Sequence, residues 1–471
     1  MSNWHTAWAQ VEREVEGCLS DMGALPVSSP ASPGEVRQAI ESGFDFGKPM
    51  PLPAVTTRVI DLLRRHTIHV THPRYFGLFN PSVPAASIVA DALVALYNPQ
   101  LAAWSHSPAA NEIERLTLRY FTRSIGFDPD ASAANFTSGG LEANLSALAV
   151  ALAHRFPSYR REGLAAIGSK PTVYVSSESH HSFVKICRVV GLGEDALREV
   201  PTTRDFAMDP AALRDLIAID SRSGRLPFFL VGTAGTTGGG IVDPLADLAD
   251  VAAEFNLWLH VDAAWGGAAL LVPRLRPLLR GIERSDSVTW DAHKWLSVAM
   301  GAGMFFCRHG EAARSAFDIA TSYMPAGTGD STVDPYRTTL QWSRRAIGLK
   351  VFMSLAELGG TGLSEQVEHQ ARMGDLLKQK LTEAGWIVVN DTALPLVCAT
   401  HEDIRAGRCA IADLVKSVQT LGRVWISDVV LGRREQVVRA CITSFRTQEE
   451  DLNVLISELE RARGEQAKAK S

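Results

Sequence analysis

The sequence predicts an α/β fold, in which a mostly parallel β-sheet is covered by helices on both faces. From about residue 133 to residue 306, short β-rich runs alternate with helical patterns, which is typical of such sheets. Strands are expected at residues 172–176, 228–233, 257–261, 287–290 and 303–306. The pair Asp243-Pro244 supplies an expected N-cap and first-turn proline for a helix that runs to Phe255, which completes a βαβ unit.

The segments on either side of this sheet predict additional units. Pro, Ser and Gly cluster at residues 25–34 and 47–53, so the N-terminal region is expected to be a helix followed by a linker. Further helices are expected at residues 87–120, 365–381 and 449–463. The predicted organisation is an N-terminal helical arm, a large α/β domain and a smaller C-terminal α+β domain, at residues 1–85, 86–345 and 346–471.

Composition and charge limit the expected partners and location. The chain has 471 residues and a net charge of -5, with 47 basic and 52 acidic residues scattered along it, so no nucleic-acid partner is expected. The first residues are polar and no apolar run reaches about 18 residues, which favours a cytoplasmic protein without membrane contact. The six cysteines are widely spaced, so reduced core thiols are favoured over disulfides or metal ligands, and no metal site is expected.

Two motifs predict a site at the carboxyl ends of neighbouring strands. LHVDAAW (Leu259–Trp265) and DAHKW (Asp291–Trp295) each follow a predicted strand, and the interval between them fits one helix and one return strand. Open α/β sheets place their ligands at this edge. We therefore expect Asp262 and Lys294 to converge there.

Lys294 and Asp262 together suit a cofactor that carries an aldehyde on a pyridine ring. A lysine at the end of an apolar strand is costly to desolvate as an ammonium, which favours the neutral amine that attacks an aldehyde. A nearby aspartate keeps a pyridine nitrogen protonated, so that the ring accepts electrons from a carbanion formed beside the amine nitrogen. The alternative is a structural ion pair between the two side chains.

Three further turns could hold the other parts of such a ligand. FTSGGLEANLSAL (Phe136–Leu148) predicts a strand, a glycine turn and an apolar helix, whose backbone N–H groups can bind an anion together with the Ser138 hydroxyl. The turn Gly235-Thr236-Thr237 is similar, and His180 in SSESHHS follows a strand where a planar ring could stack on it. Each of these features also occurs in purely structural turns.

Taken together, these motifs resemble the group II pyridoxal phosphate (PLP)-dependent amino-acid decarboxylases, the family of aromatic-L-amino-acid and glutamate decarboxylases. The resemblance extends from about His72 to Thr447, and HPRYF, SPAANEIE, GTAGTT, HKW and the SRR of Ser343–Arg345 also occur in the family's order. It implies an aspartate-aminotransferase-like fold (PLP fold type I) and a homodimer whose active sites lie at the subunit interface.

The resemblance also implies roles for individual residues. Lys294 matches the lysine that holds PLP as an imine, Asp262 the partner of the pyridine nitrogen, and His180 the histidine that stacks on the ring. Tyr323 matches the tyrosine of a mobile catalytic loop that protonates the product. The remaining matches are expected to bind the cofactor: Ser138, Gly139 and His293 at its phosphate, Ala264 under its ring, and Thr237 beside the cofactor or the substrate carboxylate.

The sequence leaves open the roles of one residue, Asp291, and of one segment, residues 323–337. Many family members carry asparagine or another neutral residue where this chain has Asp291, so the role of Asp291 is left open. Residues 323–337 are polar and rich in Gly and Pro, which fits either a mobile loop over the site or an ordinary surface connection.

We therefore expect decarboxylation of an L-amino acid to its amine and CO2, through an external aldimine and a quinonoid. Phe76, Phe79 and Trp104, the last from across the dimer interface, favour an aromatic substrate if they do not serve only core packing. The alternatives are an acidic amino acid or diaminobutyrate, and oxidative decarboxylation to an aldehyde. More distant alternatives are a transaminase or lyase with Arg439 or Arg446 on the substrate carboxylate, and a catalytically silent binding protein.

Overall fold

Two β-sheets carry the fold. The computed structural model describes residues 3–322, 324 and 332–469. A seven-stranded sheet has the strand order β1-β7-β6-β5-β4-β2-β3, and a four-stranded sheet has the order β10-β11-β9-β8. The strands are β1 (Ala133–Thr137), β2 (Lys170–Ser176), β3 (Leu197–Val200), β4 (Arg225–Thr233), β5 (Trp258–Asp262), β6 (Ser287–Asp291), β7 (Gly303–Cys307), β8 (Ile387–Val388), β9 (Leu396–Thr400), β10 (Ser427–Leu431) and β11 (Glu435–Cys441).

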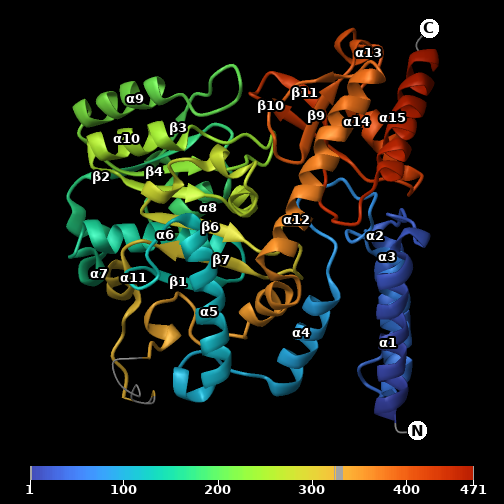
Figure 1. Cartoon of the computed structure of the whole chain (residues 1–471), viewed down its shortest axis with the longest axis horizontal. Coiled ribbons are helices and arrows are strands. Elements are labelled where there is room, and N and C mark those ends of the chain that lie inside the picture. The colour runs from blue at the N-terminus through green and yellow to red at the C-terminus, as the bar shows by residue number, and fades with distance from the viewer. Residues whose placement is uncertain (1–2, 323, 325–331, 470–471) are drawn as a thin grey trace.

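The large sheet is mostly parallel and covered on both faces, as the sequence predicts. Strands β3, β2, β4, β5 and β6 pair in parallel, while β7 is antiparallel to both β6 and β1. In β2, Val173 and Val175 belong to the apolar cluster under α6, α8 and α11, whereas Tyr174 between them packs with α9 and α10. These helices are α6 (Gly140–Arg155), α8 (Ser182–Val189), α9 (Pro210–Arg222), α10 (Leu245–Phe255) and α11 (Gly310–Phe317). Figure 1 shows α9 and α10 together on one side of the sheet.

The helical pattern expected at residues 87–120 is interrupted in the structure. It forms two helices, α4 (Ala85–Tyr97) and α5 (Pro108–Ile125). Asn98 ends α4 in the left-handed conformation at a φ of 45°, and the proline that follows it disfavours helical backbone. Pro108 then begins α5, because a first-turn proline lacks only an N–H that has no intrahelical partner.

The N-terminal arm contains three helices, where the sequence predicts one helix and a linker. They are α1 (Asn3–Asp21), α2 (Pro33–Gly43) and α3 (Leu52–His66), and α1 and α3 lie side by side (Figure 1). Helix α2 was missed although Ser32 and Glu35 form a capping box at its start.

The remaining helices near the small sheet are α12 (Gly348–Glu383), α13 (Glu402–Arg405), α14 (Ile411–Thr420) and α15 (Glu449–Ala469). Helix α7 (Tyr159–Glu162) is a single turn that follows α6. Helix α12 is broken at Gly359, whose φ of 65° favours glycine. The domain boundaries expected at residues 85 and 345 stay predictions.

All six cysteines lie in the described residues and none forms a disulfide. Five of them are buried, and burial raises the pKa of Cys307 to about 12. This agrees with the reading of these residues as core thiols. No helix within residues 3–322 and 332–469 is long and apolar enough to cross a membrane.

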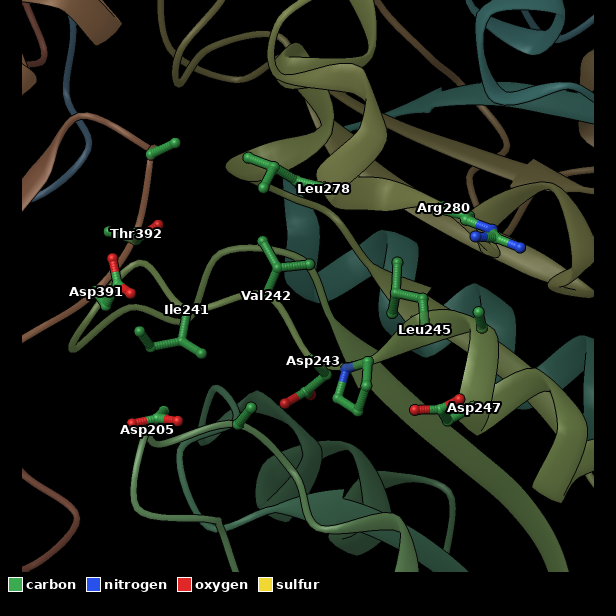
Figure 2. Close-up of a pocket in the computed structure, with 14 residues that line it drawn as sticks. Asp205, Ile241, Val242, Asp243, Leu245, Asp247, Leu278, Arg280, Asp391 and Thr392 are labelled. Carbon is green, nitrogen blue, oxygen red and sulfur yellow. The ribbon is translucent and has the colours of Figure 1, made fainter.

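Asp243 has a different role from the expected N-cap. Helix α10 begins at Leu245, and the carboxylate of Asp243 instead accepts hydrogen bonds from the backbone N–H groups of Met208 (2.7 Å) and Thr233 (2.8 Å). Figure 2 shows Asp243 between the loop that carries Asp205 and the start of α10. Asp243 is 1% exposed, so its carboxylate fixes this loop against the end of β4, and burial raises its pKa to about 6.

Replacing Asp243 by alanine should lower the free energy of unfolding by about 1–3 kcal/mol for each of the two buried N–H groups left without an acceptor. The raised pKa means that the folded state holds the proton more tightly than the unfolded chain. The stabilisation by Asp243 is therefore greatest below about pH 4 and declines as the pH rises through about 6.

Urea denaturation at pH 5 and pH 7 measures this effect. The decrease in the free energy of unfolding caused by Asp243→Ala should be larger at pH 5 than at pH 7. The control is Asp247→Ala, which removes an exposed carboxylate in the first turn of α10 and should cost less than about 1 kcal/mol. A loss for Asp243→Ala that grows with pH would contradict the assignment.

Candidate active site

The candidate site lies where β4, β5 and β6 end. Parallel pairing sets Asp262, the last residue of β5, beside Thr233 in β4 and Thr289 in β6. The turn after β6 carries Lys294 to the same edge. One pocket there is lined by several of the residues singled out in the sequence, namely His180, Thr237, Asp262, Ala264 and Lys294.

Lys294 is paired with Asp291 in this structure. Its Nζ lies 3.1 Å from Asp291 Oδ2, and the Asp291 side chain is 1% exposed. The same oxygen lies 3.7 Å from Nε2 of His293, and Asp291 Oδ1 has no hydrogen-bond partner among the described residues. Burial lowers the pKa of His293, although Asp291 acts to raise it. Asp291 therefore holds the amine of Lys294 at the pocket.

Asp262 is held by donors to both of its oxygens. Oδ2 accepts a hydrogen bond from Nδ2 of Asn144 (2.9 Å), and Oδ1 accepts one from the backbone N–H of Ala264 (3.1 Å). Asp262 is 6% exposed, so these two donors supply the partners that a buried carboxylate needs. Asn144 was missed in the sequence, although asparagine is a weak helix former and is unusual on the buried face of an apolar helix.

The turn between β1 and α6 offers donors to an anion. In this structure the backbone N–H and the hydroxyl of Ser138 both donate to Oε2 of Glu142, at 2.8 and 2.7 Å. The turn lies close to the end of β6, since a Cβ on Gly140 would be 2.9 Å from Asp291 Oδ2 and one on Gly139 would be 3.4 Å from the ring of His293. The residues expected at a phosphate are thus brought together.

His180 and Thr237 also line the pocket. Nδ1 of His180 accepts a hydrogen bond from the backbone N–H of Ser182 (3.2 Å), so the neutral ring carries its proton on Nε2. Partial burial lowers the pKa of His180, and Asp262 acts to raise it. The carbonyl of Thr237 accepts a hydrogen bond from Nε of Arg439 (2.9 Å).

Phe76, Phe79 and Trp104 are the aromatic residues expected at the substrate. Of these three, Phe79 alone lines this pocket in the single chain described. Phe79 stacks on Trp265, with ring centroids 4.7 Å apart, and lies 5.5 Å from Lys294 Nζ. Phe76 is fully buried in the core of the small sheet. Trp104 lies in a short 3₁₀ helix and donates to Glu112 (3.0 Å), outside this pocket.

The two arginines considered as carboxylate clamps have different surroundings. Arg439 is 2% exposed, lies 5.0 Å from the Phe79 ring, and also donates to the carbonyl of Gly77 (2.8 Å). Arg446 donates to the carbonyls of Cys18 and Leu19 and so ties α1 to the rest of the chain. Tyr323 lies outside the described residues.

The donor set fits a pyridine aldehyde with a phosphate group. Lys294 supplies the amine, Asp262 a carboxylate for a ring nitrogen, and the Ser138 turn the donors for an anion. The side chain of Ala264 leaves room for a ring. The space between the side chains is about 70 Å³, so side chains that line it must move to admit the whole group.

Comparisons with known proteins agree with this site. Residues 33–401 match the pyridoxal-dependent decarboxylase conserved domain. A tyrosine decarboxylase from Oryza sativa subsp. japonica is 31% identical over 83% of this chain and 75% of its own length. An L-2,4-diaminobutyrate decarboxylase from Rhizobium meliloti (strain 1021) is 32% identical over 66% of this chain and 63% of its own.

The fold agrees with solved structures as well. The crystal structure of Oryza sativa TDC with PLP and tryptamine superposes with a TM-score of 0.89 at 24% identity, and covers 98% of each chain. This likeness extends to both sheets of the chain. The expected PLP fold type I is therefore confirmed, and the chain belongs to the pyridoxal-dependent decarboxylase family.

Proposed function

We propose that this PLP-dependent decarboxylase converts an aromatic L-amino acid to its amine and CO2. The observation that carries the proposal is the aromatic wall beside the reactive amine, formed by Phe79 and Trp265 in the pocket and by Trp295 stacked behind them at 5.3 Å. Offset aromatic stacking and dispersion favour a flat apolar side chain at such a wall. The tyrosine decarboxylase relative supports the same substrate class.

The positions of the cofactor residues support the roles that we propose for them. When bound, PLP supplies a ring that accepts the electrons left behind as CO2 departs. The amine of Lys294 would hold the cofactor covalently, and the carboxylate of Asp262 would accept a hydrogen bond from the pyridine nitrogen. Ser138, Gly139 and His293 hold the phosphate, while Ala264 leaves space below the ring.

His180, Thr237 and Tyr323 act on the substrate side. His180 would stack on the cofactor ring, and the Thr237 hydroxyl would position the cofactor or the substrate carboxylate. Tyr323 donates the proton to the α-carbon after CO2 leaves. Trp104 of a second subunit completes the substrate pocket.

An acidic amino acid or diaminobutyrate is the second candidate substrate. Arg439 favours it, since this buried guanidinium lies against Phe79 and its Nη2 has no hydrogen-bond partner among the described residues. The diaminobutyrate decarboxylase relative supports this candidate. The cytoplasmic location expected from the sequence stays a prediction.

The test of this proposal is a product screen of the PLP-loaded enzyme. Aromatic amino acids should yield amine and CO2 in equal amounts, measured by mass spectrometry, and faster than glutamate, aspartate or diaminobutyrate. Lys294→Ala should abolish amine formation, because no other described amine faces the pocket.

Borohydride reduction gives an independent reading of the same site. It should fix the cofactor on the peptide that contains Lys294 and leave Lys350 unlabelled, which is a buried lysine paired with Asp91. Labelling of Lys350 alone, or amine formation from acidic substrates alone, would overturn the respective part of the proposal.

Replacing Tyr323 by phenylalanine separates the decarboxylase from the oxidative alternative. In air-saturated buffer the variant should bind PLP and substrate with unchanged affinity but divert product from amine toward aldehyde and ammonia, since the proton donor is lost and dissolved O2 serves as the oxidant, which is reduced to peroxide. Amine, aldehyde and peroxide are measured together. A product profile identical to that of the wild-type enzyme would remove Tyr323 from the protonation step.

We also infer a homodimer from the apolar surface of the arm. Trp4 and Trp8 stack on each other on α1 and are 59% and 48% exposed, while Leu63 on α3 is 58% exposed. Apolar surface of this kind on neighbouring helices is typical of an interface. A second copy that covers it would bring the arm of one subunit against its partner.

Light scattering should give twice the chain mass of 51.0 kDa for the wild-type protein. The double variant Trp4→Glu and Trp8→Glu should weaken the dimer, because charged side chains are costly to bury at an interface. Arg13→Gln, which changes an exposed residue on a different face of the same helix from Trp4 and Trp8, serves as control. A wild-type monomer at micromolar concentration would refute the inference.

A further inference from the structure

A chain of buried polar side chains leads from the interior of the large sheet to Asp262. Nε1 of Trp258 donates to Oγ of Ser287 (2.9 Å), which lies 2.9 Å from Nδ1 of His260. On the other side of the imidazole, Nε2 lies 3.0 Å from Oδ1 of Asn144. The amide of Asn144 then donates to Oδ2 of Asp262 at 2.9 Å.

The chemistry of the end groups fixes the direction of every hydrogen bond in this chain. The carbonyl oxygen of Asn144 only accepts, so Nε2 of His260 must carry a proton. Nδ1 of the neutral ring then accepts from the hydroxyl of Ser287, whose oxygen in turn accepts from the Trp258 indole, a pure donor. All donors therefore point toward the carboxylate of Asp262.

The surroundings keep His260 neutral and in place. His260 and Ser287 are 0% exposed, and Asn144 is 2% exposed. The imidazole stacks on Phe229 with ring centroids 5.8 Å apart. Burial lowers the pKa of His260 to about 4, although Asp262 acts to raise it.

One further side chain faces the imidazole. Thr289 Oγ1 lies 3.4 Å from Nε2, farther than the oxygen of Asn144, and is a weaker partner of the same N–H. The Thr289 hydroxyl does not change the direction of these hydrogen bonds, because the carbonyl of Asn144 still requires a donor at Nε2 of His260.

We propose that Asn144 and His260 are positioning residues that set the orientation of the Asp262 carboxylate toward the cofactor's pyridine nitrogen, with Ser287 fixing the tautomer of His260. The proposal rests on the role of Asp262 in the proposed function. Without the imidazole, the amide of Asn144 could rotate and present its oxygen to Asp262. The orientation of Asp262 thus depends on Asn144, which lines the pocket, and on His260 and Ser287 behind it, which do not.

The aligned hydrogen bonds also turn the positive ends of their dipoles toward the Asp262 carboxylate. Hydrogen bonds aligned head to tail in a low-dielectric interior polarise one another in the same direction. The final donor, Asn144, comes from α6, the helix that begins at the anion-binding turn after Ser138. The same helix therefore positions both the phosphate donors and the partner of the ring nitrogen.

The test compares binding of PLP with binding of its 1-deaza analogue, in which carbon replaces the pyridine nitrogen. Dissociation constants are measured by absorbance titration of the apoenzyme, so that turnover is not needed. Asn144→Ala should weaken PLP binding about tenfold and leave binding of the analogue unchanged, because the lost donor acts through Asp262 and the ring nitrogen. Ser287→Ala should show the same selectivity with a smaller loss.

Two neighbouring serines provide matched controls. Ser146 is buried on the same helix as Asn144, and its hydroxyl donates to the carbonyl of Glu142 (2.9 Å). Ser285 is buried two residues before Ser287, and its hydroxyl donates to the carbonyl of Ile282 (2.7 Å). Neither serine belongs to the series of hydrogen bonds that leads to Asp262. Ser146→Ala and Ser285→Ala should therefore leave the ratio of the two dissociation constants unchanged.

The outcomes separate positioning from a structural role. Equal weakening of PLP and the analogue by Asn144→Ala, or no weakening of either, would overturn the inference. Asp262→Ala in the same assay tests the underlying function, since it should abolish the preference for PLP. If Asp262→Ala keeps that preference, the proposed role of Asp262 fails. If Asp262→Ala abolishes the preference for PLP and Asn144→Ala does not, only the inferred positioning role of Asn144 and His260 fails.

Discussion

The parallel register of β4, β5 and β6 is the constraint on which the site depends. Because these strands run in the same direction, Thr233, Asp262 and Asp291 reach one edge of the sheet although they are far apart in the sequence. The antiparallel β7 then brings the anion-binding turn to that edge. A Cβ on Gly303, the first residue of β7, would lie 2.7 Å from Cα of Gly139 and 2.8 Å from Asp291 Oδ1, so this approach requires glycine.

The site holds two nearly buried carboxylates near a single amine. Asp262 is compensated by hydrogen-bond donors, whereas Asp291 is compensated by the ion pair with Lys294. Since an unpaired buried charge is costly, the two carboxylates are not equivalent when Lys294 changes partners. The donors to Asp262 do not involve Lys294, whereas among the described residues Asp291 has charged or chargeable contacts only with Lys294 and His293. A change of partner at Lys294 would therefore alter the surroundings of Asp291 more than those of Asp262.

Local sequence patterns predicted the large sheet and the convergence of Asp262 and Lys294, because both depend on strand ends that hydrophobic runs mark clearly. The break at Asn98 was missed, since the apolar spacing continues on both sides of it. Phe76 was expected near the substrate but lies in a core, because sequence alone does not distinguish two apolar surfaces. Asn144 was missed for a related reason: its partners His260 and Asp262 come from β5, which is distant in the sequence.

Glu142 shows how the anion-binding turn is satisfied within the chain. Its carboxylate accepts from the backbone N–H and hydroxyl of Ser138 and from the amide of Gln341 (2.8 Å), so it takes the place of an external anion at the start of α6. A phosphate that used the same donors would have to displace this carboxylate, and the two negative charges would repel each other. Release of Glu142 toward Gln341, which comes from the segment just before α12, would relieve that repulsion. An anion that used the Ser138 donors would therefore compete with the carboxylate of Glu142 that also binds Gln341.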